Sequence, residues 1–502
     1  MTTFWTSAAA HPDEVVVIDD AGVEYTAGTV LTLANQLVHS LRAHGLQRGD
    51  VVAVALRNRV EMIAVYMAAL QAGWYFAPMN TGLAAPEIAH ILGDSGAKVM
   101  IVDAHSVDAA RAAANVPLYA VDEIDGVTPF AALIAGQPTT TPDDRVAGDR
   151  LFYTSGTTGR PKAVKRRIRG ETPEQAAASA AQHLAGVAEI QPHSHAVHLV
   201  TSPLYHSASL LWCVDHLHLG HRVVLMDKWS AEGTLERIAR YRVTGALVVP
   251  THFYRLLALP DDVRARFDLS SLRTVIHTGA ACPAHIKRRM LEWWGPVLYE
   301  VYGAAEGGGT RISPTEWLAH PGSVGKGWGR IRVLRADGEP CAPGETGTVY
   351  MKAGAAPFEY HNDPDKTAAA KRGTFFTVGD LGYLDAEDYL FLNGRASDMI
   401  ISGGVNIYPA EIEAVLVTHP DVADAAVFGI PDDEWGEQVK AVVEPRPGAS
   451  AHLATELGAY CREKLAAHKC PRSIDFATLP RDANGKLRKR DLRDPYWVGR
   501  MV

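Results

Sequence analysis

The sequence predicts an α/β fold with a large N-terminal domain of two doubly wound α/β subdomains plus a small β-barrel, and a smaller α+β C-terminal domain. Three observations predict it. Strand-like and helix-like runs alternate in two stretches before about residue 314, a pattern typical of parallel sheets covered on both faces. Residues 324–394 are then rich in glycine and turns, and residues from 399 onward form a compact pattern of their own.

The first alternating stretch lies near the N-terminus. Apolar residues between 31 and 41 fall at helical spacing, and Gly45 follows as a C-terminal stop signal. Residues 51–56 predict a buried strand, 61–72 a helix and 99–102 a further strand. At 502 residues the chain is too long for one ordinary core, so two or more domains are expected.

The second alternating stretch follows a Gly-rich loop. Its predicted strands are 196–200, 222–226, 246–249, 274–277 and 297–301, and its predicted helices are 210–219, 231–241 and 285–294. The later predicted elements are a strand at 347–351, a helix starting at Pro409, and strands at 425–428 and 438–443.

The composition, with 47% apolar and 21% charged residues, is that of a soluble globular protein. A net charge of -8 argues against bulk affinity for nucleic acid. The five cysteines form no C-x-x-C pair, so neither a disulfide framework nor a structural zinc site is indicated. The N-terminus has no signal-peptide pattern, and no apolar run approaches the ~18 residues of a membrane span. We therefore expect a cytoplasmic protein without stable membrane insertion.

The loop from Thr154 to Lys162 has the composition of a phosphate-binding segment. Four hydroxyl side chains and two glycines fall within residues 154–159, and such a loop can donate several hydrogen bonds to phosphate oxygens, with Lys162 adding charge. A flexible Ser/Gly linker is the alternative, but the preceding apolar residues and the Pro161-Lys162 ending count against it. The nucleotide-binding P-loop motif does not fit, because it needs glycine directly before the lysine.

Four further residues, in three segments, could carry chemistry. Glu306 follows the predicted strand 297–301, where open α/β sheets usually bind ligands. Asp380 and Arg395 supply an acid suited to ribose hydroxyls and a planar cation. Lys486 ends a tight turn that begins at Asp482. Taken alone, a carboxylate or lysine in such a place is more often solvated surface than a functional group.

Taken together, the order and spacing of these motifs resemble the adenylate-forming superfamily of acyl-CoA synthetases, firefly luciferases and peptide-synthetase adenylation domains, in its acyl-CoA ligase branch. The resemblance covers nearly the whole chain. The motifs that carry it are 154–162, 203–206, 249–251, 302–306, 379–380, 394–395, 403–413 and 485–486.

The resemblance implies a role for each matching position. It implies that Lys486, Glu306 and His206 are catalytic, with Lys486 bridging to the reacting carboxylate and His206 at the mouth of the acyl pocket. It implies that Mg²⁺ is held by Glu306 and Thr158, and that Asp380 and Arg395 hold the ribose. The remaining positions implied to bind ATP or AMP are Thr154, Ser155, Gly156, Thr157, Thr158, Gly159, Lys162, Gly279, Ala280, Ala281, Tyr302, Gly303 and Ala305.

The resemblance also implies a moving C-terminal domain and two further sites. The N-terminal domain would span 1–395 and bind ATP and the acid, and the mobile domain would span 396–502 and pivot near Ser397. Gly403 and Gly404 would line the passage for coenzyme A. The small residues of these motifs leave room for a bulky apolar acid, such as a long-chain, steroid-like or terpenoid-like one. The implied acyl pocket consists of Tyr205, Ser209, Trp212, Thr251, Phe253 and Gly307.

The chain departs from the family pattern at four positions: Ala163 after the phosphate loop, Ala305 before the glutamate, Val378 and Ser397. Ala305 replaces a hydroxyl that would contact phosphate, and a hydrogen bond to a charged group contributes ~1.5–3 kcal/mol. Ala163 would add backbone strain of ~1–2 kcal/mol if that position needs a positive φ. One interpretation is neutral drift in a working ligase. The other is a ligase impaired in adenylation that transfers a preformed acyl-adenylate to coenzyme A.

Two other classes stay open at this point. A stand-alone adenylation domain would load a carrier protein instead of coenzyme A, although the chain has no carrier module. A ligand-binding relic would form no product, but Lys162, Asp380, Arg395 and Lys486 are all retained. The expected partners are a small carboxylic acid and coenzyme A, and both a homodimer and a companion ligase that supplies acyl-adenylate are compatible with this chemistry.

Overall fold

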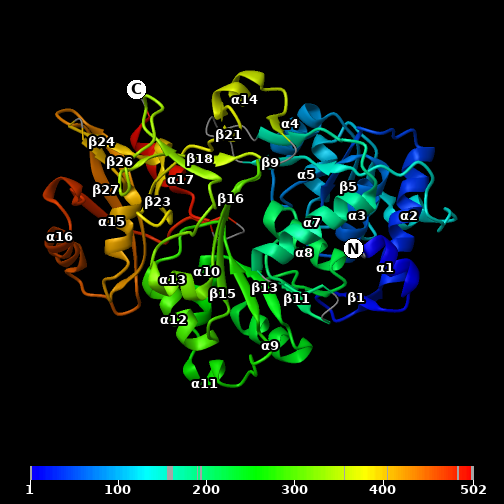
Figure 1. Ribbon diagram of the computed structural model, residues 1–502, viewed down its shortest axis with the longest axis horizontal. Helices are drawn as coiled ribbons and strands as arrows, with labels where there is room; N and C mark the ends of the chain where they lie inside the picture. Colours follow the sequence, from blue (N-terminus) through cyan, green and yellow to red (C-terminus); the bar gives the residue numbers. More distant parts are fainter. Residues whose placement is uncertain are drawn as a thin grey trace.

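The computed structural model describes residues 3–154, 162–188, 190–192, 195–354, 357–403, 405–482 and 486–498. It contains two large α/β sheets, antiparallel sheets that lie against them, and a smaller C-terminal α+β unit on the opposite side from the N-terminus (Figure 1). This arrangement confirms the predicted fold class.

The first sheet is fully parallel, as the alternation predicts. In spatial order its strands are β7 (Thr128–Pro129), β6 (Leu118–Ala120), β5 (Ala97–Val102), β3 (Val51–Ala55), β4 (Tyr75–Pro78) and β8 (Asp149–Arg150). Its helices are α2 (Ala27–Ala43), α3 (Val60–Ala72), α4 (Ala85–Ser95), α5 (Val107–Ala113) and α6 (Phe130–Ile134).

The second sheet has eight strands, and its central strands are parallel. In spatial order they are β16 (Gly309–Ile312), β15 (Leu298–Gly303), β14 (Thr274–His277), β13 (Gly245–Val248), β11 (Val197–Val200), β12 (Arg222–Leu225), β1 (Val15–Ile18) and β2 (Glu24–Thr26). The helices of this region are α1 (Phe4–Ala10), α7 (Pro173–Ala188), α8 (Ser207–His218), α9 (Ala231–Tyr241), α10 (Pro250–Leu257), α11 (Asp261–Arg264), α12 (Ala284–Trp294) and α13 (Pro314–Ala319).

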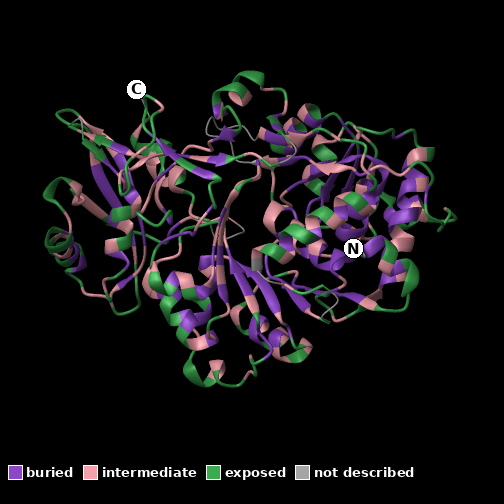
Figure 2. Ribbon diagram, in the orientation of Figure 1, coloured by how far each residue is buried: buried purple, intermediate pink, exposed green. Residues whose placement is uncertain are grey.

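Both edges of this second sheet differ from the sequence expectation. The pairs β15–β16 and β1–β2 are antiparallel, and β1 reaches the sheet from the far N-terminal end of the chain. One apolar cluster joins residues of both large sheets, from Val52 and Ile63 to Leu210 and Val223. The two α/β subdomains therefore share a core, which is visible as the buried strands and helices of Figure 2.

The Gly-rich region forms antiparallel sheets, as expected for short strands linked by turns. One sheet contains β17 (Ile331–Leu334), β18 (Gly347–Lys352), β20 (Lys371–Arg372), β21 (Phe375–Phe376), β22 (Asp380–Leu384) and β23 (Leu390–Arg395). A second, of three strands, contains β9 (Phe152–Thr154), β10 (Lys162–Arg166) and β19 (Phe358–Tyr360), with α14 (Pro364–Ala370) following. The Gly-rich loop therefore connects two paired strands, β9 and β10.

The C-terminal unit has its own apolar core, which includes Ile412, Leu416, Val427 and Leu457. Its elements are β24 (Ile400–Ser402), β25 (Val405–Ile407), α15 (Pro409–Leu416), β26 (Val422–Asp432), β27 (Gly436–Pro445), α16 (Leu453–Lys464), β28 (Ser473–Phe476) and α17 (Lys489–Arg493), with short 3₁₀ turns at Ala396–Asp398, Ala467–Lys469 and Asp494–Tyr496. Over the described part of the chain, none of the helices combines the length and apolar character needed to cross a membrane.

Candidate active site

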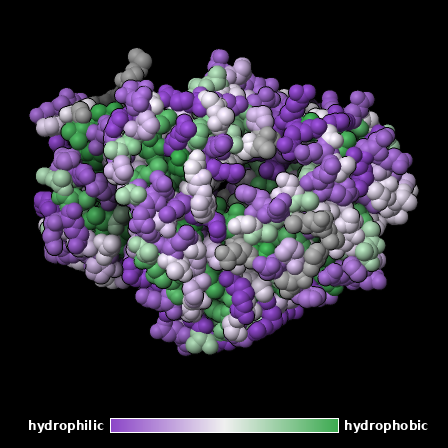
Figure 3. All heavy atoms as spheres, in the orientation of Figure 1, coloured by the Kyte–Doolittle hydropathy of each residue, from purple (hydrophilic) through white to green (hydrophobic). Residues whose placement is uncertain are grey.

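The predicted site residues gather at the carboxyl ends of the parallel strands in the second sheet. His206 immediately precedes α8, Thr251 lies at the start of α10, Gly279 follows β14 and Glu306 follows β15. Loops that follow neighbouring parallel strands emerge on the same edge, which is where open α/β sheets bind ligands. Figure 3 shows the surface hollowed near the middle of one face, with hydrophobic residues visible inside the recess.

Tyr302, Asp380 and Arg395 form a connected polar group beside the open turn at Gly279. The Tyr302 hydroxyl donates to Oδ2 of Asp380 at 2.6 Å, and Arg395 Nε lies 3.3 Å from Oδ1 of the same carboxylate. Asp380 opens β22 and pairs with Arg395 at the end of β23, so backbone pairing fixes their proximity. Burial and then the charge of Asp380 raise the pKa of Tyr302, which keeps this phenol protonated as a donor. Ala280 and Ala281 are exposed and leave a flat, open turn next to it.

The Glu306 turn is held by two residues that sequence reasoning missed. The Tyr360 hydroxyl donates to Oε1 of Glu306 at 2.7 Å, and Glu306 itself is buried. The Arg166 guanidinium donates from Nη2 to the carbonyl of Ala305 at 2.6 Å and interacts electrostatically with Glu306. Burial lowers the pKa of Arg166, with Arg150 contributing in the same direction. The signal that could have found Arg166 is its position four residues after Lys162, on the same strand.

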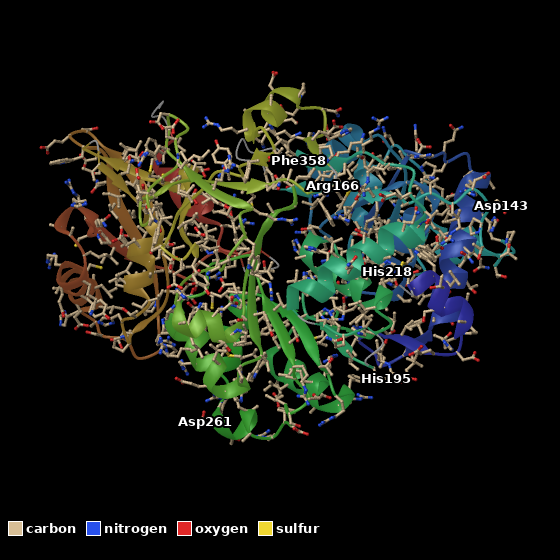
Figure 4. The ribbon with its side chains drawn as sticks, in the orientation of Figure 1. Asp143, Arg166, His195, His218, Asp261 and Phe358 are labelled. Atoms are coloured by element: carbon tan, nitrogen blue, oxygen red, sulfur yellow. The ribbon has the colours of Figure 1, made fainter. Side chains whose placement is uncertain are left out.

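Strand pairing explains why these two residues meet the turn. On β10 and β19, Val164 pairs with Tyr360 and Arg166 pairs with Phe358. Figure 4 shows Arg166 and Phe358 side by side in the upper centre of the molecule. The strand after the phosphate loop thus supplies the cation that binds the carbonyl of Ala305, the residue that lacks the usual hydroxyl.

Lys162 lies at the start of β10 and forms an ion pair with Asp363, a residue that the sequence motifs do not include. Burial lowers the pKa of the nearby Lys366, and the positive charge of Lys162 lowers it further. Ser155, Gly156, Thr157, Thr158 and Gly159 lie outside the described residues, and so do the side chain of Thr154 and the proposed metal contact of Thr158.

A single buried carboxylate, Glu306, is compatible with a magnesium–nucleotide complex. Mg²⁺ is usually held by one or two carboxylates together with substrate phosphates and water. Within the described ranges there is no cluster of three or more histidine, cysteine or acidic side chains that would form a metal site of its own. Glu306, oriented by Tyr360, is the carboxylate that could supply a protein oxygen to such a metal.

Lys486 enters the same region from the C-terminal unit. Its charge interacts with Arg395, Asp380 and Asp398, and burial, followed by Arg395, lowers its pKa. His206 interacts with the charge of Lys486 in turn, and burial lowers the pKa of His206 to about 4. The structure thus brings His206, Glu306 and Lys486, the three residues implied to be catalytic, into one region. His206 and Lys486 are 280 positions apart in the sequence. We call the region between them the active-site cleft.

The predicted coenzyme A and hinge positions lie at the entrance to the C-terminal unit. Gly403 joins β24 to β25 with a φ of +55°, and a Cβ there would lie 2.5 Å from the Trp435 ring, so only glycine fits. Gly404 lies outside the described residues. Ser397 is exposed in the 3₁₀ turn after β23, and its hydroxyl donates to Asp398 at 3.1 Å.

An apolar surface runs from His206 along α8. Ala208 and Trp212 of α8 pack with Leu247 of β13 and Ile276 of β14. The other members of the cluster are Ile190 and, on β15, Tyr299 and Val301. Trp212 and its α8 neighbour Ala208 are only partly buried, as expected for side chains that line a pocket. We call this group the acyl-pocket cluster. Thr251 lies in the first turn of α10, Gly307 follows Glu306 and lies near Arg166, and Tyr205 contacts the His206 ring with 4.3 Å between centroids.

Two predicted pocket residues do not belong there. Phe253 is fully buried on the opposite face of the sheet, against His277 and Trp294. Ser209 is buried, and its hydroxyl donates to the carbonyl of Ser202 at 2.7 Å. The rotation of each helix about its axis decides which side chains face the sheet surface beside α8, and a sequence motif does not specify that rotation.

The expectation of strain at Ala163 is wrong. Ala163 lies inside β10, pairs with Tyr153, and is not among the residues with positive φ. Its side chain is fully buried in the core of the first sheet. The methyl group therefore contributes packing instead of strain.

Ala163→Gly, which restores the usual family residue, should destabilise the protein without raising activity. Glycine in a strand costs roughly 0.5–1 kcal/mol, and a lost buried methyl costs about 0.8 kcal/mol more. Denaturant unfolding should show a loss of about 1–2 kcal/mol, with adenylation within twofold of wild type. An increase in adenylation of tenfold or more would contradict this.

A polar group of Tyr302, Asp380 and Arg395 with Lys486 nearby is the arrangement expected of a nucleotide-binding enzyme. Comparison with known proteins identifies the family. The family described as AMP-binding enzyme matches residues 4–356, and its C-terminal domain matches residues 411–486. The chain belongs to this family, the adenylate-forming superfamily, and it is an acid–thiol ligase that binds ATP and AMP.

Three relatives illustrate the match. A long-chain-fatty-acid–CoA ligase of Mycobacterium tuberculosis is 33% identical over 488 residues, covering 94% of this chain and 93% of the relative. A feruloyl-CoA synthase of Amycolatopsis is 35% identical over 483 residues, covering 93% of this chain and 94% of the relative. The solved o-succinylbenzoate CoA synthetase of Bacillus subtilis, in complex with its acyl-adenylate, has a TM-score of 0.83 at 29% identity and covers 98% of each chain.

Proposed function

We propose that this enzyme converts a bulky apolar carboxylic acid to its coenzyme A thioester through an acyl-adenylate, and that it performs both half-reactions itself. The observation that carries the proposal is the convergence of Lys486, His206, Asp380 and Arg395 on one cleft, next to the apolar cluster along α8. Relatives named as ligases of long-chain, aromatic and succinylbenzoate acids support the reaction class.

In the first half-reaction, a carboxylate oxygen attacks the α-phosphorus of ATP and pyrophosphate leaves. Two unit charges ~4 Å apart repel by about 1 kcal/mol in water and by several kcal/mol at the lower dielectric of a cleft. Lys486 would bridge the carboxylate and the α-phosphate, while Glu306 would hold the magnesium of the nucleotide. Asp380 and Arg395 would fix the ribose, and Lys162 would exchange Asp363 for a phosphate oxygen.

In the second half-reaction, the coenzyme A sulfur attacks the acyl carbon, AMP leaves and the thiol proton is lost. Lys486 lies in the active-site cleft near Arg395, Asp380 and His206. Because adenylation and thioester formation need different groups in this cleft, we propose that the unit 396–502 reorients about Ser397 relative to residues 1–395. Gly403 and Gly404 would then line the pantetheine passage. Separate conformations for unlike steps are common in enzymes with mobile domains.

Two structural observations favour complete adenylation over the impaired alternative. Ala163 is unstrained, and Arg166 supplies a charge-assisted hydrogen bond to the turn where Ala305 lacks a hydroxyl. The two interpretations are separated by ATP–pyrophosphate exchange measured beside thioester formation from synthetic acyl-AMP.

With a well-matched acid, we expect exchange and overall thioester formation at comparable rates. Exchange lower by a factor of about 100 or more than the transfer from acyl-AMP would support the impaired alternative. Replacing coenzyme A with a holo-carrier protein in the same assay tests the carrier-loading alternative, for which only the carrier should accept the acyl group.

A further inference from the structure

The inner end of the acyl-pocket cluster is polar. Strands β11, β13 and β14 present alternate residues to α8. The row nearest the cleft contains Val200, Leu247 and Ile276, which pair directly with one another. One step farther along the same face, the row contains His198, Gly245 and Thr274. A molecule that passes along the apolar row therefore reaches a histidine.

His198 has an unused hydrogen-bonding atom. The residue is 2% exposed, and its Nδ1 is buried without a hydrogen-bond partner among the described residues. A buried polar atom without a partner costs roughly 1–3 kcal/mol, and such atoms need an explanation. Gly245, which pairs with His198, adds no side chain to this row, and a Cβ there would lie only 2.8 Å from the Thr274 carbonyl oxygen.

Two further histidines, His216 and His221, lie next to His198, whose buried ring is neutral. Its ring stacks on His216 of α8, with centroids 4.1 Å apart and planes 15° from parallel. His216 Nδ1 lies 2.9 Å from His221 Nδ1, and His221 Nε2 lies 2.9 Å from the Gln191 carbonyl. Because a carbonyl only accepts, His221 donates from Nε2, and its Nδ1 accepts from His216. Burial lowers the pKa of His198 to about 3, so its ring carries no charge at neutral pH.

We propose that His198 recognises the far end of the acyl group, and that the preferred acid carries a neutral hydroxyl or carbonyl there. This inference rests on the proposed function. A hydroxyl can pair with either neutral tautomer of His198, whereas an uncharged ring offers no countercharge to a second carboxylate. The ten residues from His206 to His216 rise by roughly 15 Å along α8, which sets the separation between the two ends of the acid.

The test compares matched acids. One pair is ω-hydroxydodecanoate and dodecanoate, and a second is lithocholate and cholanate, which place a hydroxyl at the end of a chain and of a rigid ring system. Dodecanedioate supplies the anionic end group. For each acid, kcat/KM of ATP–pyrophosphate exchange is measured with wild type, His198→Leu and His198→Gln, and with His218→Leu as the control. Like His198, His218 is a buried histidine whose Nδ1 has no hydrogen-bond partner among the described residues, but it lies on α8 and its ring is near Trp5 of α1, with 6.3 Å between centroids.

We expect the wild type to prefer the hydroxylated member of at least one pair by about 10- to 100-fold, and to use dodecanedioate worst. His198→Leu should bring the preference close to unity while retaining the rate with the unsubstituted acid, a change that general destabilisation would not produce. His198→Gln, which keeps a donor and an acceptor, should retain part of the preference, and it serves as the test if His198→Leu does not fold. His218→Leu should leave the ratio unchanged.

Two outcomes would overturn the inference. One is a wild-type enzyme that uses the unsubstituted acids as well as the hydroxylated ones or better. The other is a preference that survives His198→Leu. Either result would leave the proposed function intact, because acids would still be activated. Failure to activate any of these acids, together with failure to transfer their synthetic adenylates to coenzyme A, would instead contradict the proposed function and this inference with it.

Discussion

Lys486→Ala should lower ATP–pyrophosphate exchange by about 100- to 1000-fold, the loss typical for removal of one preorganised group that stabilises transition-state charge. Lys486 lies in the cleft beside Arg395, Asp380 and His206, and it would contact both the carboxylate and the α-phosphate only during adenylation. Transfer of a preformed acyl-adenylate to coenzyme A should therefore change by less than a few-fold.

The matched control for this variant is Lys469→Ala. Lys469 lies in the same C-terminal unit and pairs with Glu411 at 2.7 Å, away from the cleft, so its removal should leave both half-reactions unchanged. Equal losses in exchange and in transfer after Lys486→Ala would show that the lysine is structural and would remove it from the mechanism.

The pKa of Lys486 adds a pH dependence to the same experiment. Burial, with Arg395 next in size, lowers this pKa from the ordinary lysine value of 10.5. Only the protonated amine attracts the carboxylate, so kcat/KM for adenylation should fall as pH rises through the lowered pKa. In Lys486→Arg the side chain should stay charged, so the fall in kcat/KM at alkaline pH should disappear. His206, with a pKa of about 4, should cause no change in kcat/KM near neutral pH.

Arg166→Met should lower kcat/KM for adenylation by about 10- to 100-fold. The substitution removes a charge-assisted hydrogen bond to the carbonyl of Ala305, which contributes ~1.5–3 kcal/mol, and a cation beside Glu306. Because the Glu306 turn would hold magnesium–ATP, the loss should appear in the KM for magnesium–ATP as well as in kcat. Transfer from acyl-AMP, which needs no magnesium–ATP, should be affected less.

Arg167→Met is the control, because Arg167 is the next residue on the chain and is exposed. Arg166→Lys should recover part of the loss, since it restores the charge but not the planar donor group. If Arg166→Met and Arg167→Met had equal activity, the proposed compensation for the missing hydroxyl at Ala305 would be wrong.

The sequence by itself determined the element types and the segments of the site. The predicted bounds match the structure fully for β14 and α9, and nearly so for β3. The reason is that the spacing of apolar side chains along a short segment indicates whether the segment is a helix or a strand. The segments that contain Tyr302, Asp380 and Lys486 were singled out because the order and spacing of their motifs resemble those of the adenylate-forming superfamily.

Only the tertiary structure decided which side chains meet. Arg166 reaches Ala305 across 139 positions, and Tyr360 reaches Glu306 across 54. Helix rotation turned Phe253 away from the acyl pocket, and strand pairing showed that Ala163 is unstrained. Periodicity tells which face of an element is apolar, but not which distant element covers it. Contacts such as those of Arg166 and His198 arise when sheets and helices pack, so they are read from the folded chain.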